Sequence, residues 1–312
     1  MSTNKTPQKA LVLSGGSILG AFQAGAIKQV LESGFQPDII MGISAGALNS
    51  SFLVNEAGKM NGSLSWPEIG NALRNFWLNN VQKPQDLLYR RSKVALALQF
   101  LTHRFNGWFD YTPLVKLIQK ELKLTHLRNS PVELMVGAVD WTEGDIEYPD
   151  KAHPQLIDFI IASASIPVIL PAWSINDRPY VDGGIRDVTP LSQVIDKGIE
   201  EIVVILTQPA KMAESKGKAT NLLNFLERII NIMLNEILLN DLLTLNKINQ
   251  EVLKFKDSNK KPTGILENKR FIKCTIIRPK QAYDFQIQNF TDKDIQQLIS
   301  DGEKVASEVI LS

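Results

Sequence analysis

The sequence is poor in cysteine and histidine, two residues that enzymes often use for nucleophilic and acid–base chemistry. Its 312 residues contain one cysteine and three histidines. The single cysteine, Cys274, excludes an intramolecular disulfide, and its apolar, β-branched surroundings predict a buried structural thiol in a reducing compartment. The histidines are His103, His126 and His153, so roughly the second half of the chain offers no histidine as a catalytic base.

The sequence also lacks an excess of charge of either sign and a long unbroken apolar run. Its 34 Lys and Arg residues face 33 Asp and Glu residues, so the overall charge offers no attraction for nucleic acid. The polar first nine residues do not resemble a signal peptide. Charged and amide side chains interrupt the longest apolar region, residues 222–245, which falls short of the ~20 apolar residues of a spanning helix. We therefore expect a cytoplasmic protein, soluble or peripheral at a membrane, with no nucleic-acid partner.

Short apolar runs alternate with helical patterns along the chain. Helical periodicity is found at residues 25–33, 47–56, 114–122 and 155–163. The runs that we predict to be buried strands are residues 11–13, 39–41, 132–139, 202–206 and 271–277. This alternation predicts an α/β fold, with a mainly parallel sheet covered by helices on both faces and a ligand site beyond the carboxyl ends of its strands.

Three further segments complete the predicted organisation, which we interpret as one domain over residues 1–312. Residues 61–104 are expected to form a helical insertion over the sheet, and residues 211–218 a loop. The periodicity of residues 222–254 predicts a long helix, with an apolar stripe of Leu222, Leu226, Ile229, Met233 and Ile237. We expect this stripe to pack on the core, although contact with lipid or with a partner subunit is also open.

A G-x-S-x-G motif carries the clearest chemical signal. Residues 42–46, Gly-Ile-Ser-Ala-Gly, directly follow a predicted strand and directly precede a predicted helix. In this context a sharp turn presents the serine above the sheet, and the flanking glycines, Gly42 and Gly46, avoid collisions with neighbouring backbone. The motif therefore predicts that Ser44 is a nucleophile.

The base for this serine cannot follow the usual pattern. An α/β-hydrolase triad takes its histidine late in the chain, after the acid, and no histidine occupies such a position. The best remaining candidate is Asp182, which is followed by Gly183 and Gly184 at the end of an apolar stretch. Burial would raise its pKa enough to accept the serine proton, whereas the alternative is an aspartate that only satisfies amides in a tight turn.

A glycine-rich loop at residues 14–21, SGGSILGA, also follows a strand and opens a helix. Such a loop aims several backbone N–H groups at one point, which suits either a nucleotide phosphate or the oxyanion of an acyl intermediate. Because the spacing matches neither G-x-G-x-x-G nor a P-loop, we favour an oxyanion hole made by Gly15, Gly16 and Ser17.

Taken together, these motifs resemble the patatin-like phospholipases. The four matching blocks are residues 14–25, 42–49, 162–167 and 182–184, and the resemblance covers residues 9–207. It implies a patatin-type three-layer fold, completed by helices and a strand in residues 221–312. It also implies a Ser44–Asp182 dyad with the oxyanion loop at Gly15, Gly16 and Ser17, hydrolysis of lipid acyl esters, and no metal or cofactor.

The first block departs from the family pattern at two positions. The family usually has a third glycine and then a basic residue where this chain has Ser17 and Leu19. The main alternative to a lipid acyl hydrolase is a thioesterase or acyltransferase that uses the same serine. The altered loop also leaves room for a non-catalytic lipid-binding relative, and a nucleotide-binding oxidoreductase is a more distant alternative.

Overall fold

A five-stranded sheet forms the centre of the protein. The computed structural model describes residues 8–60, 64–103, 105–211, 222–258, 263–267, 269–283 and 287–311. Within these residues the sheet has the order β11-β10-β1-β2-β5, and every neighbouring pair is parallel. The strands are β1 (Lys9–Leu13), β2 (Ile39–Gly42), β5 (Glu133–Val136), β10 (Glu201–Ile205) and β11 (Lys273–Ile277). The predicted parallel sheet is confirmed.

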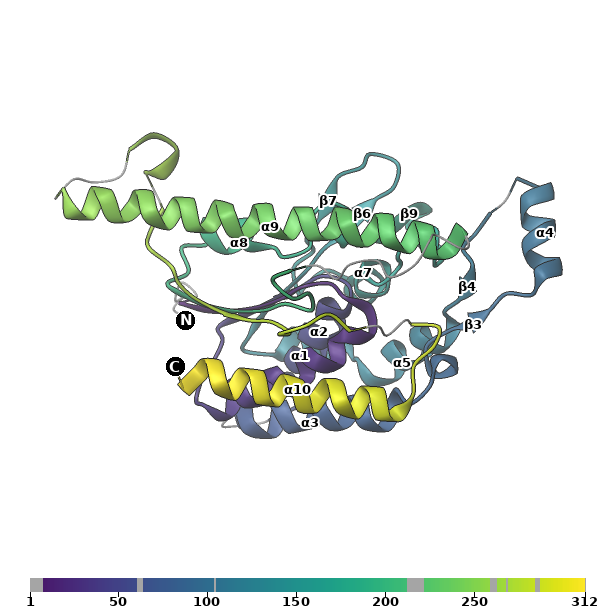
Figure 1. The fold of residues 1–312 in the computed structure, drawn as a ribbon, viewed down its shortest axis with the longest axis horizontal. Helices are drawn as coiled ribbons and strands as arrows, with labels where there is room; N and C mark the ends of the chain where they lie inside the picture. Colours follow the sequence, from purple (N-terminus) through teal and green to yellow (C-terminus); the bar gives the residue numbers. More distant parts are fainter. Residues whose placement is uncertain are drawn as a thin grey trace.

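Helices cover both faces of this sheet. Successive side chains of β1 point to opposite faces, so Leu11 and Leu13 join one apolar cluster while Ala10 and Val12 join another. The first cluster is covered by α1 (Gly20–Glu32) and α2 (Ala45–Lys59), with α3 (Trp66–Asn80) and α10 (Asp292–Leu311) outside them. The second is covered by α8 (Leu191–Asp196) and α9 (Leu222–Asp257). Figure 1 shows the resulting three layers, which the α/β prediction anticipated.

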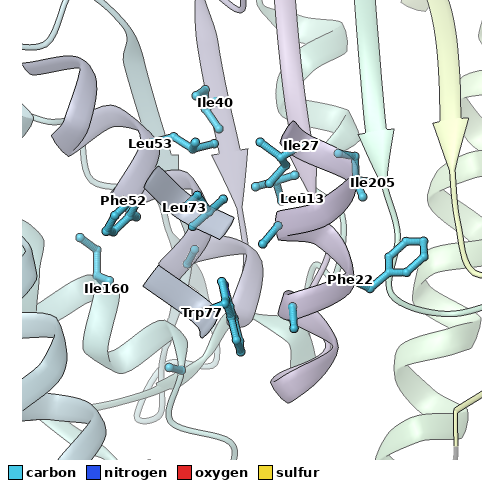
Figure 2. Packing of buried hydrophobic residues seen from close by; sticks show 14 of the residues in the cluster. Leu13, Phe22, Ile27, Ile40, Phe52, Leu53, Leu73, Trp77, Ile160 and Ile205 are labelled. Atoms are coloured by element: carbon cyan, nitrogen blue, oxygen red, sulfur yellow. The ribbon is translucent and has the colours of Figure 1, made fainter. Parts of the chain in front are cut away.

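The larger part of the core lies between the sheet and the first helical layer. Strand residues point toward α1, α2 and α3, and α7 (Leu156–Ser163) closes the side of the cluster. Figure 2 shows this packing for Leu13, Phe22, Ile27, Ile40, Phe52, Leu53, Leu73, Trp77, Ile160 and Ile205. These side chains are at most 6% exposed. Dense packing on this scale holds the carboxyl ends of β1 and β2 in fixed positions.

The strand predicted at residues 132–139 is two strands in different sheets. β5 belongs to the parallel sheet, whereas β6 (Ala138–Asp140) belongs to a four-stranded antiparallel sheet with β7 (Ile146–Glu147), β8 (Trp173–Ile175) and β9 (Arg178–Asp182). The chain passes between the sheets at Gly137. A Cβ there would lie 2.7 Å from the Tyr148 ring and 2.8 Å from Ile43 Cδ1, so a larger residue would force these side chains to move. The apolar run could not reveal this break, because both strands are buried.

The predicted insertion is helical, as expected, but only part of it covers the core. α3 packs against α1, whereas α4 (Lys93–Leu101) stands away from the body at one end of the molecule (Figure 1). A short ribbon of β3 (Tyr89–Arg90) and β4 (Phe109–Asp110) connects α4 to the rest of the protein. The helices α5 (Thr112–Glu121) and α6 (Leu124–Asn129) follow. Most of the predicted loop 211–218 lies outside the described residues.

The long helix α9 packs on the sheet through a different stripe from the predicted one. Leu238, Leu245 and Val252 are buried, whereas Met233 is 53% exposed and Ile229 is 38% exposed. The predicted stripe is therefore wrong at Ile229 and Met233, whereas the side chains of Leu222 and Leu226 lie outside the described part of the structure. Leucine and isoleucine occur at so many positions of residues 222–239 that periodicity alone could not fix which of them meet the sheet. No helix in the described part of the chain, α9 included, is long and apolar enough to cross a membrane.

The C-terminal segments belong to the same layered structure. β11 extends the sheet beside β10, and Cys274 lies half-buried within it, where burial raises the pKa of its thiol to about 11. α10 packs directly on α1. Two glycines make this contact close, since a Cβ on Gly302 would lie 2.1 Å from the Phe22 carbonyl oxygen and a Cβ on Gly25 would lie 2.0 Å from that of Ile299.

This contact predicts an unusual response to a Gly→Ala substitution. Alanine normally stabilises a helix interior by about 1 kcal/mol relative to glycine. We expect Gly302→Ala instead to lower the free energy of unfolding by roughly 1–3 kcal/mol, because α1 and α10 must move apart. Urea denaturation measures the change. The matched control is Ser300→Ala on the exposed face of α10, which should be neutral or slightly stabilising. A Gly302→Ala protein as stable as the wild type would contradict the packing.

Candidate active site

Ser44 lies at the sharp turn between β2 and α2. Its backbone angles are φ 55° and ψ −122°, a strained conformation for a residue with a side chain. The turn is possible because Gly42 and Gly46 lack side chains: a Cβ on Gly42 would lie 2.2 Å from the Gly46 carbonyl oxygen, and one on Gly46 would lie 2.3 Å from that of Leu13. Ser44 is 6% exposed and stands at the amino end of α2, where the helix dipole favours negative charge.

Asp182 reaches Ser44 from the second sheet, at the end of β9. The backbone of Gly183 lies against Gly137 at the junction of the two sheets, and Ile43, the neighbour of Ser44, contacts both glycines. The Asp182 carboxylate accepts a hydrogen bond from the Gly184 N–H at 2.8 Å. Burial raises the pKa of Asp182 to about 7, even though the nearby Ser44 hydroxyl and the Gly184 N–H lower it. The two predicted residues therefore lie together.

The segment between α7 and β8 supports both residues, through side chains that our sequence analysis did not assign. The Ser44 N–H donates to Ser163 Oγ at 3.0 Å, and the Asp182 N–H donates to the Ser165 carbonyl at 3.0 Å. The Ser165 hydroxyl donates to the Ile161 carbonyl, so it accepts the hydrogen bond from the Tyr111 hydroxyl at 2.9 Å. The block 162–167 contained these serines, but sequence alone does not show which side chain each would meet.

The glycine-rich loop follows β1 and lies beside Ser44. A Cβ on Gly15 would lie 3.3 Å from the Ser44 Cβ. However, the Gly15 N–H donates to the Val188 carbonyl at 3.3 Å, and the Thr207 hydroxyl donates to the Gly15 carbonyl at 2.5 Å. The N–H groups of Gly16 and Ser17 have no acceptor among the residues that the structure describes. Gly15 thus holds the loop in place, while Gly16 and Ser17 keep free donors.

A buried polar network fixes the base of this loop. The Gln23 side-chain amide donates to the carbonyls of Ser14 at 2.9 Å and Ile205 at 3.1 Å. Asn49 donates to Gln23 Oε1 at 3.0 Å, and the Trp77 indole N–H donates to Asn49 Oδ1 at 2.8 Å. All three side chains are at most 4% exposed, so each of these bonds is made away from water. The network joins α1, α2 and α3 to the ends of β1 and β10.

The two departures from the family pattern have different structural consequences. Ser17 has φ 54°, which a glycine would adopt without strain, and its buried hydroxyl has no hydrogen-bond partner among the described residues. Leu19 is partly buried and packs against the main apolar cluster. The leucine therefore contributes to packing at the start of α1, while the serine makes the loop strained.

The three histidines lie on other elements than these residues. His103 is exposed just after α4, His126 is part of α6, and His153 packs its ring against Phe159. Among the described residues, no group of three or more His, Cys, Asp or Glu side chains is arranged to hold a metal ion. The arrangement around Ser44 is thus a strained serine, a buried carboxylate and a loop of backbone donors.

This geometry agrees with the comparison of the sequence with known families. The family model of the patatin-like phospholipases matches residues 11–195. The chain belongs to the patatin-like phospholipase family. The matched residues include the strands from β2 to β9, the strained Ser44 and the buried Asp182.

Similar proteins include both characterised and uncharacterised relatives. The uncharacterized protein YjjU of Escherichia coli is 26% identical over 65% of this chain and 53% of its own length. Lysophospholipase NTE1 of Cryptococcus neoformans is 23% identical over 64% of this chain and 11% of its length. Triacylglycerol lipase SDP1L of Arabidopsis thaliana is 37% identical over 22% of this chain and 8% of its length. The chain thus spans about half the length of YjjU and a much smaller part of NTE1 and SDP1L.

The buried carboxyl predicts how activity and stability depend on pH. The pKa of Asp182 is about 7 in the folded protein against 3.8 for an ordinary aspartate, so between about pH 4 and pH 7 the folded state binds a proton that the unfolded state does not. Stability should therefore fall as pH rises through this window. If Asp182 must be ionised to act as a base, kcat/KM for a neutral p-nitrophenyl ester should rise with an apparent pKa near 7.

A second buried acid provides the control for this experiment. Burial, together with the charge of Asp187, raises the pKa of Asp241 to about 7 as well. Asp241→Asn should alter the pH dependence of stability and leave the apparent pKa of kcat/KM unchanged. A rate profile that is flat across neutral pH, or that shifts in Asp241→Asn, would rule out Asp182 as the titrating group.

The strain at Ser17 predicts the effects of substitutions in the loop. Ser17→Gly should retain or increase turnover, since glycine adopts a positive φ freely and saves about 1 kcal/mol of strain. Ser17→Ala should behave like the wild type, because the hydroxyl makes no hydrogen bond with the described residues. Ser17→Val should lower turnover at least about tenfold, since a β-branched residue resists this conformation. Steady-state kinetics with a soluble ester tests the series, and a loss of turnover in Ser17→Gly would contradict it.

Proposed function

We propose that the protein is a serine hydrolase of lipid acyl esters, of the phospholipase or lysophospholipase type, in which Ser44 and Asp182 act as a dyad. The observation that carries this proposal is the position of the strained, buried Ser44 beside the Asp182 carboxyl, whose pKa is raised by burial to about 7. An ordinary aspartate is a weak base, but one with a pKa near neutrality is suited to proton transfer at physiological pH. The family of the chain and the activities named for NTE1 and SDP1L support the substrate class.

In the first half of the reaction, the ester carbonyl oxygen accepts hydrogen bonds from the Gly16 and Ser17 N–H groups. Ser44 Oγ attacks the carbonyl carbon while Asp182 takes the hydroxyl proton. The two N–H groups and the amino end of α2 stabilise the negative oxygen of the tetrahedral intermediate. When the intermediate collapses, the bond to the alcohol breaks, Asp182 returns the proton to the leaving oxygen, and an acyl-serine remains.

In the second half of the reaction, a water molecule occupies the place that the alcohol has left and attacks the acyl-enzyme. Asp182 takes a proton from the water as its oxygen attacks the acyl-serine carbonyl, and the second tetrahedral intermediate forms in the same oxyanion hole. Its collapse breaks the bond to Ser44 Oγ, Asp182 returns the proton to that oxygen, and the fatty acid leaves. The scheme needs no cofactor, and an acceptor other than water would make the same acyl-enzyme a transferase.

We further propose that the protein acts in a reducing, cytoplasmic compartment on lipid at a membrane surface. The single cysteine, held in β11 with a raised thiol pKa, agrees with a structural thiol that stays reduced. Lipid esters with long acyl chains reside in membranes or other aggregates, so a hydrolase of such esters must bind the surface of these aggregates to reach them.

The dyad predicts a characteristic pattern of mutant kinetics. Ser44→Ala and Asp182→Asn should each lower kcat at least about 100-fold, and the double variant should lose little more than either single one, because the two residues act as a unit. The measurement is fatty-acid release from phospholipid, triacylglycerol and acyl-thioester substrates. Circular dichroism establishes that each variant is folded.

The matched controls are His103→Ala, His126→Ala and His153→Ala. Each should keep turnover within a few fold of the wild type, since none contributes to proton transfer in this scheme. A folded Asp182→Asn protein with near-normal turnover would disprove the dyad. Faster cleavage of thioesters than of oxygen esters would favour the thioesterase alternative, and no cleavage of any substrate would favour a non-catalytic lipid-binding protein.

A further inference from the structure

The helix α4 exposes large apolar side chains that make no contribution to the core. Val94, Leu98 and Leu101 follow one another at helical spacing and are 79%, 60% and 79% exposed. Phe100 and Phe105 are also exposed; their rings stack on each other, and each meets the Trp108 ring edge-on. We call these five side chains, Val94, Leu98, Phe100, Leu101 and Phe105, the α4 face. Such a concentration on one short helix and the residues that follow it usually marks an interaction surface.

The segment that contains the α4 face is basic. Residues 88–108 contain four Lys or Arg residues and no Asp or Glu, although the net charge of the whole chain is only +1. Arg90 and Lys93 are exposed beside the first turn of α4. The next acid along the chain, Asp110, accepts a hydrogen bond from the Thr112 N–H at 2.8 Å. An apolar helix with basic flanks complements an anionic bilayer, in which acyl chains lie beneath negatively charged headgroups.

The position of α4 relates this surface to the active site. Figure 1 shows α4 and the first turns of α9 at the same end of the long axis of the molecule, the end toward which β1 runs. The carboxyl ends of the parallel strands, and therefore Ser44 and the glycine-rich loop, face this end as well. The first half of α9 contributes further exposed apolar side chains there, which are Phe225, Ile229, Ile232 and Met233.

Hydrogen bonds attach the base of α4 to the segment that supports the active site. The N–H groups of Trp108 and Phe109 donate to the Ile169 carbonyl at 3.0 and 3.1 Å. Four residues earlier in the same segment, Ser165 bonds Tyr111 through its hydroxyl and Asp182 through its carbonyl. The β3–β4 ribbon from which α4 projects is thus bonded to the segment that supports Asp182.

We propose that the α4 face is a docking element for anionic phospholipid membranes, which inserts beside the headgroups and turns the active-site end of the protein toward the lipid. This inference rests on the proposed lipid substrate. The basic flanks contribute attraction to anionic headgroups, and the apolar side chains contribute the hydrophobic part of the binding. The exposed first turns of α9 lie on the same side and rest on the same surface.

The test compares binding to vesicles with hydrolysis of a soluble ester. The variant is Leu98→Ser/Leu101→Ser, and the matched control is Leu253→Ser/Leu311→Ser, which removes two exposed leucines from the ends of α9 and α10 away from α4. The vesicles contain phosphatidylcholine with about 30% phosphatidylglycerol. We expect co-sedimentation of the α4 variant to weaken at least about tenfold, and that of the control to change little. Both proteins should hydrolyse p-nitrophenyl butyrate at the wild-type rate.

A charge variant tests the electrostatic part. Arg90→Gln/Lys93→Gln should weaken binding to the anionic vesicles by about fivefold for each charge at low salt, and should leave the weaker binding to pure phosphatidylcholine unchanged. The loss should disappear at high salt, because salt screens exposed charges.

Three results would overturn the α4 proposal. They are no vesicle binding by the wild type, equal binding by the wild type and the α4 variant, and a wild-type dimer that Leu98→Ser/Leu101→Ser converts to a monomer, since the face would then bind a second copy of the chain. If the proposed function is wrong, the wild type will not hydrolyse the soluble ester, whether or not the α4 face binds vesicles. This result is therefore distinct from a failure of the α4 proposal.

Discussion

The structure depends on bringing one buried carboxylate to one strained serine from two different sheets. Ser44 follows a strand of the parallel sheet, β2, whereas Asp182 ends a strand of the antiparallel sheet, β9. The sheets meet where the backbones of Gly137 and Gly183 lie against each other beside Ile43. A Cβ on Gly183 would lie 2.5 Å from the Gly137 carbonyl oxygen, so a side chain there would push the backbones apart and move Asp182 away from Ser44. A single close contact of backbone with backbone thus positions the chemistry, and the surrounding layers hold that contact in place.

Both functional groups carry a free-energy cost that the rest of the fold offsets. Burial of Asp182 disfavours its ionised form, and the positive φ of Ser44 is strained. The compensating interactions are the hydrogen bond from the Gly184 N–H to the carboxylate, the nearby Ser44 hydroxyl, and the Gln23–Asn49–Trp77 network beneath the loop. Ser17 adds strain at the point where the family usually has glycine. The same burial that costs stability raises the pKa of Asp182 to a value useful for proton transfer.

The sequence predicted the parts of this arrangement that depend on local pattern. The strand–serine–helix turn, the parallel sheet and the pairing of Ser44 with Asp182 follow from motifs and from the shortage of histidine. The parts that depend on packing between distant segments were not predictable. These include the division of the strand at Gly137, the phase of α9, and the commitment of the Gly15 N–H to Val188. Ser163 and Tyr111 were missed for the same reason, since a serine or tyrosine in an apolar segment does not reveal its partner.

The most direct test of the central claim is covalent labelling with a fluorophosphonate, followed by peptide mass spectrometry. The account predicts one phosphonyl group per chain, attached to the peptide that contains Ser44. It also predicts labelling slowed by about two orders of magnitude or more in a folded Asp182→Asn protein, because the hydroxyl proton then has no acceptor. An unlabelled Ser44 peptide in the wild type, or a label on Ser44 that forms at the wild-type rate in Asp182→Asn, would contradict the account.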